Sequence, residues 1–209
     1  MNETNMNRLP VPTWNQCGVN AAPAAAALPE NPGDFTIATG VAAAPFLRGL
    51  LEQAQAFNGE IFENGGLVNL TDAQKAEYET LLNLNGDGVM GYIEIPRLEL
   101  KLSIGHGTEE DVLQKMVGHI EGSSLPVGGE STHAVLSAHR GLPTAKLFSD
   151  LDLMQIGDRF MIHTLNQTLT YQVDQVLIVE PDQVEALAID PNEDYCTLVT
   201  CTPYGINTH

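Results

Sequence analysis

The sequence has few basic residues. Its 209 residues include 9 lysines and arginines against 27 aspartates and glutamates, which gives a formal net charge of −18 at pH 7. A surface with this excess of negative charge repels nucleic-acid phosphates and anionic membrane surfaces. We therefore expect no nucleic-acid partner. The charge favours instead a basic partner or a substrate that carries a lysine.

Cysteine is also scarce. The three cysteines are Cys17, Cys196 and Cys201, too few for a closed disulfide framework, and no pair has the CxxC spacing of a zinc site. Residues 196 and 201 lie in a run typical of a strand, in which five residues span roughly 16 Å, too far for a disulfide. The six histidines show no HxH or HExxH pattern, so we expect no metal site.

Long hydrophobic runs are missing from the sequence. No stretch reaches the ~18 apolar residues that a membrane helix needs. The alanine-rich run over residues 21–28 is short, is interrupted by Pro23 and lacks a basic flank, so it does not predict a signal peptide. We expect the chain as given to be soluble, and any membrane attachment to use segments that it does not contain.

The residue pattern divides the chain into three parts. Residues 1–40 contain five prolines, few charges and no hydrophobic period, which predicts a flexible arm. In residues 41–86, apolar residues such as Phe46, Leu50 and Phe57 recur at helical spacing. Thr71 and Gln74 then have the spacing of a capping box, which predicts a second helix over residues 72–82. We interpret 41–86 as an N-terminal helical extension and 87–209 as the main domain.

The main domain, residues 87–209, has the pattern of a mainly β fold. Polar and apolar residues alternate over short stretches, as they do in half-buried strands. We expect strands over residues 92–96, 98–104, 132–139, 159–165, 168–179 and 195–200, and short helices over 108–117 and 143–151. Many short strands with occasional short helices predict a mixed or antiparallel β-barrel.

One loop resembles a calcium site. Asn83, Asn85, Asp87 and Glu94 have the spacing of EF-hand ligands, with Gly88 at the sixth position and asparagine at the first. An EF-hand needs a helix after the loop, whereas residues 89–95 alternate like a strand. We therefore interpret the loop as a turn between a helix and a strand, with calcium binding as the alternative.

Cys201 and His139 are the candidate catalytic residues. Cys201 ends an apolar strand run that Pro203 and Gly205 stop, and His139 ends another strand before Gly141. Two strands that end in this way can bring a thiol and an imidazole together at one barrel rim, where the imidazole helps to supply the thiolate. Alternation along the strand places Cys196 on the opposite face from Cys201. The alternative is a buried cysteine and an ordinary loop histidine.

Several motifs in this region resemble those of sortases. The stretch Thr197-Leu198-Val199-Thr200-Cys201 resembles the TLxTC signature of that family. Three further segments resemble class C sortases, which build pili, and they occur in the same order as in that class. These segments are Ser137 through Pro143, Gly91 through Pro96, and Val117 through Gly129. The likeness is nearly continuous from residue 81 to residue 209, is weaker over 43–80 and is absent over 1–40.

The resemblance implies a closed sortase-type β-barrel and a cysteine transpeptidase without a cofactor. Cys201 would attack the Thr-Gly bond of an LPxTG-type sorting signal, and His139 would serve as the acid and then the base. A lysine amine of a pilin subunit would accept the acyl group on the outer face of a Gram-positive cell. Thr200, Leu142 and Pro143 are the substrate-binding residues that we expect.

Two departures from the family pattern lead to alternative hypotheses. The catalytic arginine of the family follows the position of His209, where this sequence stops, so activity is in doubt and an unpaired edge is expected beside the last strand. The aromatic lid motif of class C is also not matched, because Ala73 and Gln74 follow Asp72; we therefore expect an open site. The alternatives are a catalytically weak module that binds sorting peptides, and a thiol hydrolase of the same peptides.

Overall fold

The computed structural model describes residues 18–28, 43–141, 145–180 and 183–202. Within them the helices are α1 (Ala43–Glu63), α2 (Asp72–Tyr78) and α3 (Glu110–Leu113). The strands are β1 (Gly18–Leu28), β2 (Val89–Ile95), β3 (Leu100–His106), β4 (Val117–His119), β5 (Thr132–Ser137), β6 (Arg159–Thr164), β7 (Gln167–Val173), β8 (Leu177–Val179) and β9 (Asp194–Thr202). Single turns of 3-10 helix occur at Pro96–Leu98, Leu151–Leu153 and Glu185–Leu187.

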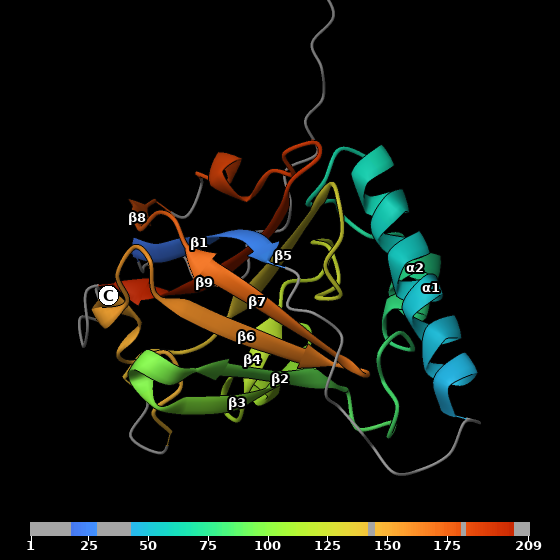
Figure 1. The fold of residues 1–209 in the computed structure, drawn as a ribbon, viewed down its shortest axis with the longest axis horizontal. Helices are drawn as coiled ribbons and strands as arrows, with labels where there is room; N and C mark the ends of the chain where they lie inside the picture. Colours follow the sequence, from blue (N-terminus) through green and yellow to red (C-terminus); the bar gives the residue numbers. More distant parts are fainter. Residues whose placement is uncertain (1–17, 29–42, 142–144, 181–182, 203–209) are drawn as a thin grey trace, which may run out of the picture.

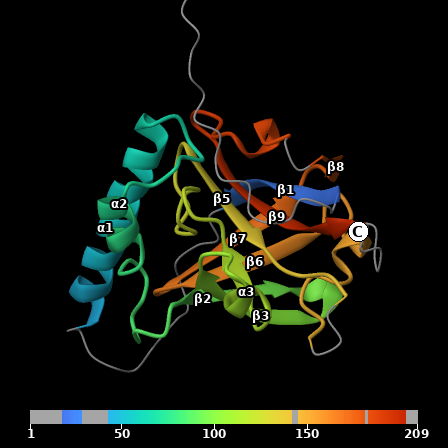
Figure 2. The ribbon, with the colours of Figure 1, turned by 180° about the vertical axis from the view of Figure 1, so that it is seen from behind.

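The two helices expected before residue 86 are both present. The apolar stripe of α1 buries Ala54, Phe57 and Ile61 in the hydrophobic core. The capping box of α2 is also formed, because Thr71 Oγ1 accepts a hydrogen bond from the Gln74 backbone and the Gln74 side chain accepts one from the Thr71 backbone. Both helices lie together on one side of the sheet, opposite β8 (Figures 1 and 2).

The strands form one curled, mainly β sheet. Their order is β7-β6-β2-β3-β4-β5-β9-β1-β8, and β1 also pairs with β7, so the ring of strands closes on itself. Most neighbours are antiparallel, while β3 with β4 and β5 with β9 are parallel. This arrangement confirms the predicted mainly β, sortase-type barrel with short helices.

Strand β1 differs from the prediction of a flexible arm. Its residues pair antiparallel with β9 from Gly18 opposite Thr202 to Ala24 opposite Cys196. Alanine-rich sequence carries no strand signal, but backbone N–H and C=O groups of a neighbouring strand edge can pair with any residue that supplies the complementary groups. The edge of β9 that we expected to be unpaired is therefore paired with β1.

The helix predicted over residues 143–151 is also not formed in its described part. Residues 147–150 make a turn that leads into the 3-10 turn Leu151–Leu153. The Phe148 N–H donates to the carbonyl of His139, 3.2 Å away, instead of to a carbonyl four residues earlier. This long-range bond replaces a helical one and fixes the segment against the end of β5. The short helix predicted from residue 108 is present, but it begins at Glu110 without a side-chain cap.

Candidate active site

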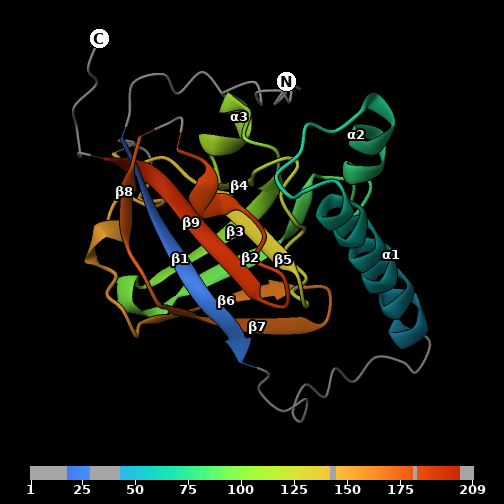
Figure 3. The same ribbon diagram turned by 90° about the horizontal axis from the view of Figure 1, so that it is seen from above.

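The strands that lead to His139 and Cys201 are neighbours in the sheet, because β5 pairs with β9. The two strands are parallel, with Ser137 opposite Val199, and the Ala138 N–H donates to the Val199 carbonyl at 3.2 Å. Continuing the register by two residues brings His139 level with Cys201 on the neighbouring strand. Figure 3 shows β5 and β9 side by side, running in the same direction. The two candidate residues, 62 positions apart in sequence, therefore lie at the same end of two neighbouring strands.

The two cysteines of β9 lie in different environments. Cys196 is fully buried in the hydrophobic core with Leu198, Ala134 and Leu136. Burial, together with the charge of Asp194, raises the pKa of the Cys196 thiol well above its usual range. Cys201 is only partly buried and, by strand alternation, faces the opposite side. The alternation argument from the sequence therefore agrees with the structure, and Cys201 is the more accessible of the two thiols on β9.

The turn that carries His139 is held at several points. Besides the bond from Phe148 to the His139 carbonyl, the Gly141 N–H donates to Ser149 Oγ at 3.1 Å. Arg140 places Nη2 2.8 Å from Asp152 Oδ1, and its side chain is nearly buried. The Arg140 guanidinium thus forms an ion pair beside the turn.

Thr200, expected to contact the substrate, has a positioning contact. It is fully buried, and its hydroxyl donates to the carbonyl of Ala138 at 2.9 Å. The bond connects β9 to β5 immediately before His139 and Cys201. A direct contact between this hydroxyl and a substrate would require the bond to break, so that role stays a prediction. Leu142 and Pro143 lie outside the described residues.

The helix α3 packs against β4, near the end of the sheet where the strands β5 and β9 lead to His139 and Cys201. Figure 3 shows it beside β4. It lies close because Gly118 of β4 has no side chain: a Cβ there would collide with the Gly107 carbonyl oxygen and lie 2.9 Å from Leu113 Cδ2. Glu110 of α3 extends toward the catalytic turn, where its Oε2 lies 3.7 Å from His139 Nε2. No sequence pattern links Glu110 to His139, because their contact depends on the packing of α3.

The calcium ligands of the loop at residues 83–94 do not converge. Asn83 Oδ1 accepts from the Gly88 N–H, Asp87 Oδ1 accepts from the Val89 N–H, and Glu94 Oε2 lies 3.6 Å from His163 Nε2 on the neighbouring strand β6. The loop is the predicted turn between a helix and a strand. Among the residues that the structure describes, no group of three or more histidine, cysteine or acidic side chains could hold a metal ion.

Three histidines are buried and hydrogen-bonded, and two of them, His106 and His119, contact Tyr78. His119 Nδ1 lies 2.9 Å from the Tyr78 hydroxyl, and its Nε2 lies 2.8 Å from the Ser124 carbonyl. His106 contacts the Leu81 and Gly88 carbonyls and packs edge-on against the Tyr78 ring. His133 bonds to Thr197 Oγ1 at 2.7 Å. Burial lowers the pKa of His119 to about 4 and also lowers that of His133, so both are neutral donors and acceptors.

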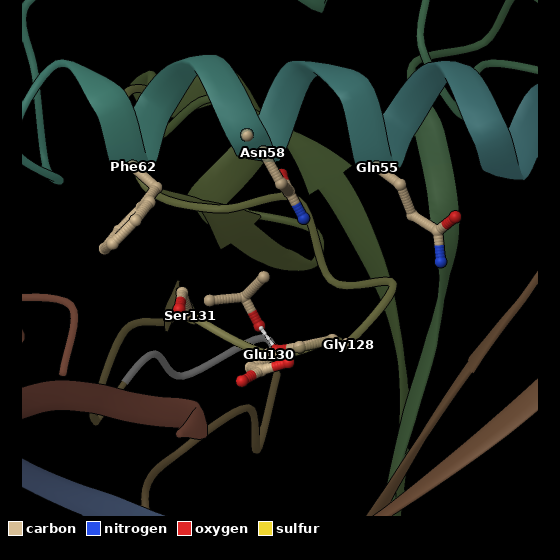
Figure 4. Close-up of a pocket in the computed structure, with 9 residues that line it drawn as sticks. Gln55, Asn58, Phe62, Gly128, Glu130 and Ser131 are labelled. Atoms are coloured by element: carbon tan, nitrogen blue, oxygen red, sulfur yellow. Dashed lines mark hydrogen bonds between the residues drawn. The ribbon is translucent and has the colours of Figure 1, made fainter. Parts of the chain in front are cut away.

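A separate hollow of about 240 Å³ lies between α1 and the loop before β5. Gln55, Asn58 and Phe62 point from the helix toward Glu130 and Ser131 (Figure 4). The hollow ends at Thr132, the first residue of β5, whereas His139 follows the other end of that strand. It is therefore remote from Cys201.

None of the helices in the described part of the chain has the length and apolar character that crossing a membrane requires.

Comparison with known proteins places this arrangement in a family. A model of the sortase domain matches residues 93–209. Sortase D of Bacillus subtilis (strain 168) is 28% identical over 143 residues, which are 68% of each chain. The sortase model covers more than half of the chain, so the chain belongs to the sortase family.

Solved structures narrow the likeness to class C. Sortase C1 from Streptococcus agalactiae superimposes with a TM-score of 0.75 at 48% identity, covering 78% of this chain and 84% of that one. Sortase C from Streptococcus pneumoniae gives a TM-score of 0.70 at 47% identity, covering 82% and 85%. Sortase C-1 from Actinomyces oris gives 0.72 at 37%, covering 79% and 93%. The class C resemblance of the sequence motifs is thus confirmed.

Proposed function

We propose that this protein is a cysteine transpeptidase that cleaves an LPxTG-type sorting signal and joins the acyl group to a lysine amine. The observation that carries the proposal is the parallel pairing of β5 and β9, which supports His139 and Cys201 as partners because they lie at the same end of the two strands. The thiol is partly exposed, as a nucleophile must be, whereas Cys196 is buried in the core. An imidazole beside a thiol favours the thiolate, which is the reactive form.

The chemistry takes place in two steps. The Cys201 thiolate attacks the carbonyl of the Thr-Gly bond, and a thioester forms as the carbon–nitrogen bond breaks. The proton of the His139 imidazolium goes to the departing amine. A lysine amine then attacks the thioester and loses its proton to His139, so that an amide bond forms and the Cys201 thiolate is released. Each group returns to its starting state.

The class C neighbours support a pilin as the partner. The S. pneumoniae structure is described in terms of pilin substrate specificity. By analogy, the donor here is a pilin with a sorting signal and the acceptor is a lysine of another pilin, on the outer face of a Gram-positive cell. The net charge of −18 agrees with a cationic lysine acceptor, since opposite charges attract during encounter.

Intact-mass spectrometry with an LPxTG-type peptide and no amine acceptor tests the proposal. We expect a mass gain equal to the acyl fragment, located on Cys201. Cys201→Ala should abolish the adduct, whereas the matched variant Cys196→Ala should retain it. Adding a lysine-containing acceptor should convert the adduct into an amide product. Release of free acid despite the acceptor would instead favour a thiol hydrolase, and peptide binding without an adduct would favour a binding module.

A further inference from the structure

We propose that Glu110 is a positioning residue that pairs with the His139 imidazole and thereby favours the thiolate of Cys201. The inference rests on the proposed function, because it concerns the same thiol and imidazole. Glu110 Oε2 lies 3.7 Å from His139 Nε2, which is within ion-pair range but beyond hydrogen-bond range. His139 Nε2 is itself buried and has no hydrogen-bond partner among the described residues. Among the described residues, the Glu110 carboxylate is therefore a charged group that faces this nitrogen.

The Glu110 side chain is oriented by its own helix. Gln114 Nε2 donates to Glu110 Oε1 at 2.9 Å, which leaves Oε2 directed toward His139. These two residues are four apart and so lie one helical turn from each other on the same face. The close approach of Leu113 to Gly118 fixes α3 against β4. The carboxylate thus reaches the catalytic turn from a short but anchored element.

Among the described residues, three charged or ionisable groups lie on elements beside His139. Glu110 approaches from α3, Cys201 lies on the adjacent strand β9, and Arg140 follows in the chain with its guanidinium paired to Asp152. When the thiol gives its proton to the imidazole, the resulting cation gains one negative neighbour in the thiolate and a second in Glu110. Opposite charges within this range favour the ionised pair. The thiolate fraction of Cys201 at neutral pH therefore depends on Glu110.

The expected effect of Glu110 on Cys201 is small, because the Glu110 side chain is largely exposed to water. The Glu110 side chain is 70% exposed, so water and salt screen its charge strongly. A pair of this kind changes an equilibrium by about twofold to fivefold. We expect the rate of Cys201 alkylation by a small neutral reagent such as iodoacetamide to fall by about this factor in Glu110→Gln at pH 7 and low salt.

The alkylation assay needs no sorting peptide, so it separates this inference from the proposed function. The matched control is Asp111→Asn, which removes the same charge from the neighbouring exposed position, where the described residues form no ion pair with His139. We expect Asp111→Asn to react like the wild type, Glu110→Asp to recover part of the rate, and the deficit of Glu110→Gln to shrink at about 1 M salt, where the screening length is short. Equal rates in Glu110→Gln and Asp111→Asn, or a deficit that salt leaves unchanged, would overturn the inference. A wild type that is alkylated normally but forms no acyl adduct would refute the proposed function alone.

Discussion

Replacing His119 with glutamine should remove much of the acid sensitivity of this fold. His119 is fully buried, and its ring connects Tyr78 of α2 with the Ser124 carbonyl. Burial raises the pKa of Tyr78, so its hydroxyl remains protonated and donates to His119 Nδ1. A glutamine amide can supply one donor and one acceptor in place of the neutral ring, but it cannot titrate.

The magnitude follows from the pKa of His119, which burial lowers from 6.5 to about 4. Between these values the unfolded chain binds a proton that the folded protein does not. The stabilisation from His119 is therefore complete above pH 6.5 and is lost as the pH falls toward 4. Each pKa unit corresponds to about 1.4 kcal/mol, so the loss reaches about 2 kcal/mol at pH 5 and about 3 kcal/mol at pH 4.

Urea unfolding at pH 7, 6, 5 and 4 measures this effect. The lowered pKa of His133 acts in the same direction and the raised pKa of Asp194 acts in the opposite one, so only the difference between wild type and variant isolates His119. We expect His119→Gln to lose less unfolding free energy than the wild type, by about 2 kcal/mol between pH 7 and pH 5. A difference that stays constant within about 0.5 kcal/mol over this range would refute the reasoning.

Two further substitutions test the packing beside the site. Gly118→Ala should destabilise the fold by about 1–3 kcal/mol, because the new methyl group collides with the Gly107 carbonyl and presses on Leu113. It should also slow Cys201 alkylation by moving α3, and an unchanged midpoint of thermal unfolding would contradict this packing. Ser137→Ala should stabilise by about 1 kcal/mol, since the Ser137 hydroxyl is buried with no hydrogen-bond partner among the described residues. A loss of more than 1 kcal/mol in urea unfolding would show that this hydroxyl has a partner.

Local patterns allowed much of the site to be predicted from the sequence. The capping box of Thr71 and Gln74 needs only three residues of spacing, and the opposite faces of Cys196 and Cys201 need only the two-residue period of a strand. The positions of Cys201 and His139 at strand ends were marked by the glycines and prolines that follow. Their class C context came from motifs along one continuous stretch. These features depend on neighbours in the chain, and so the sequence alone reveals them.

Contacts between distant segments could not be predicted in this way. Glu110 meets His139 only because Gly118 lets α3 approach the sheet. The bond between Tyr78 and His119 joins residues 41 positions apart. The strand β1 lacks alternation or β-branched residues at most positions, and its pairing is supplied by the backbone of other strands. Such features depend on the assembled barrel and have no local signal.

The pairing of β1 also has a consequence for the order in which the molecule is built. Its partners are β7, β8 and β9, so Leu28 pairs with Thr170 and Gly18 with Thr202. During synthesis this strand emerges well before β7, β8 and β9, so it must wait until these partners have been made. Pairings of such long sequence separation form slowly, because the intervening loop must be closed first. Completion of the ring around the cysteine strand is therefore expected to be a late step in folding.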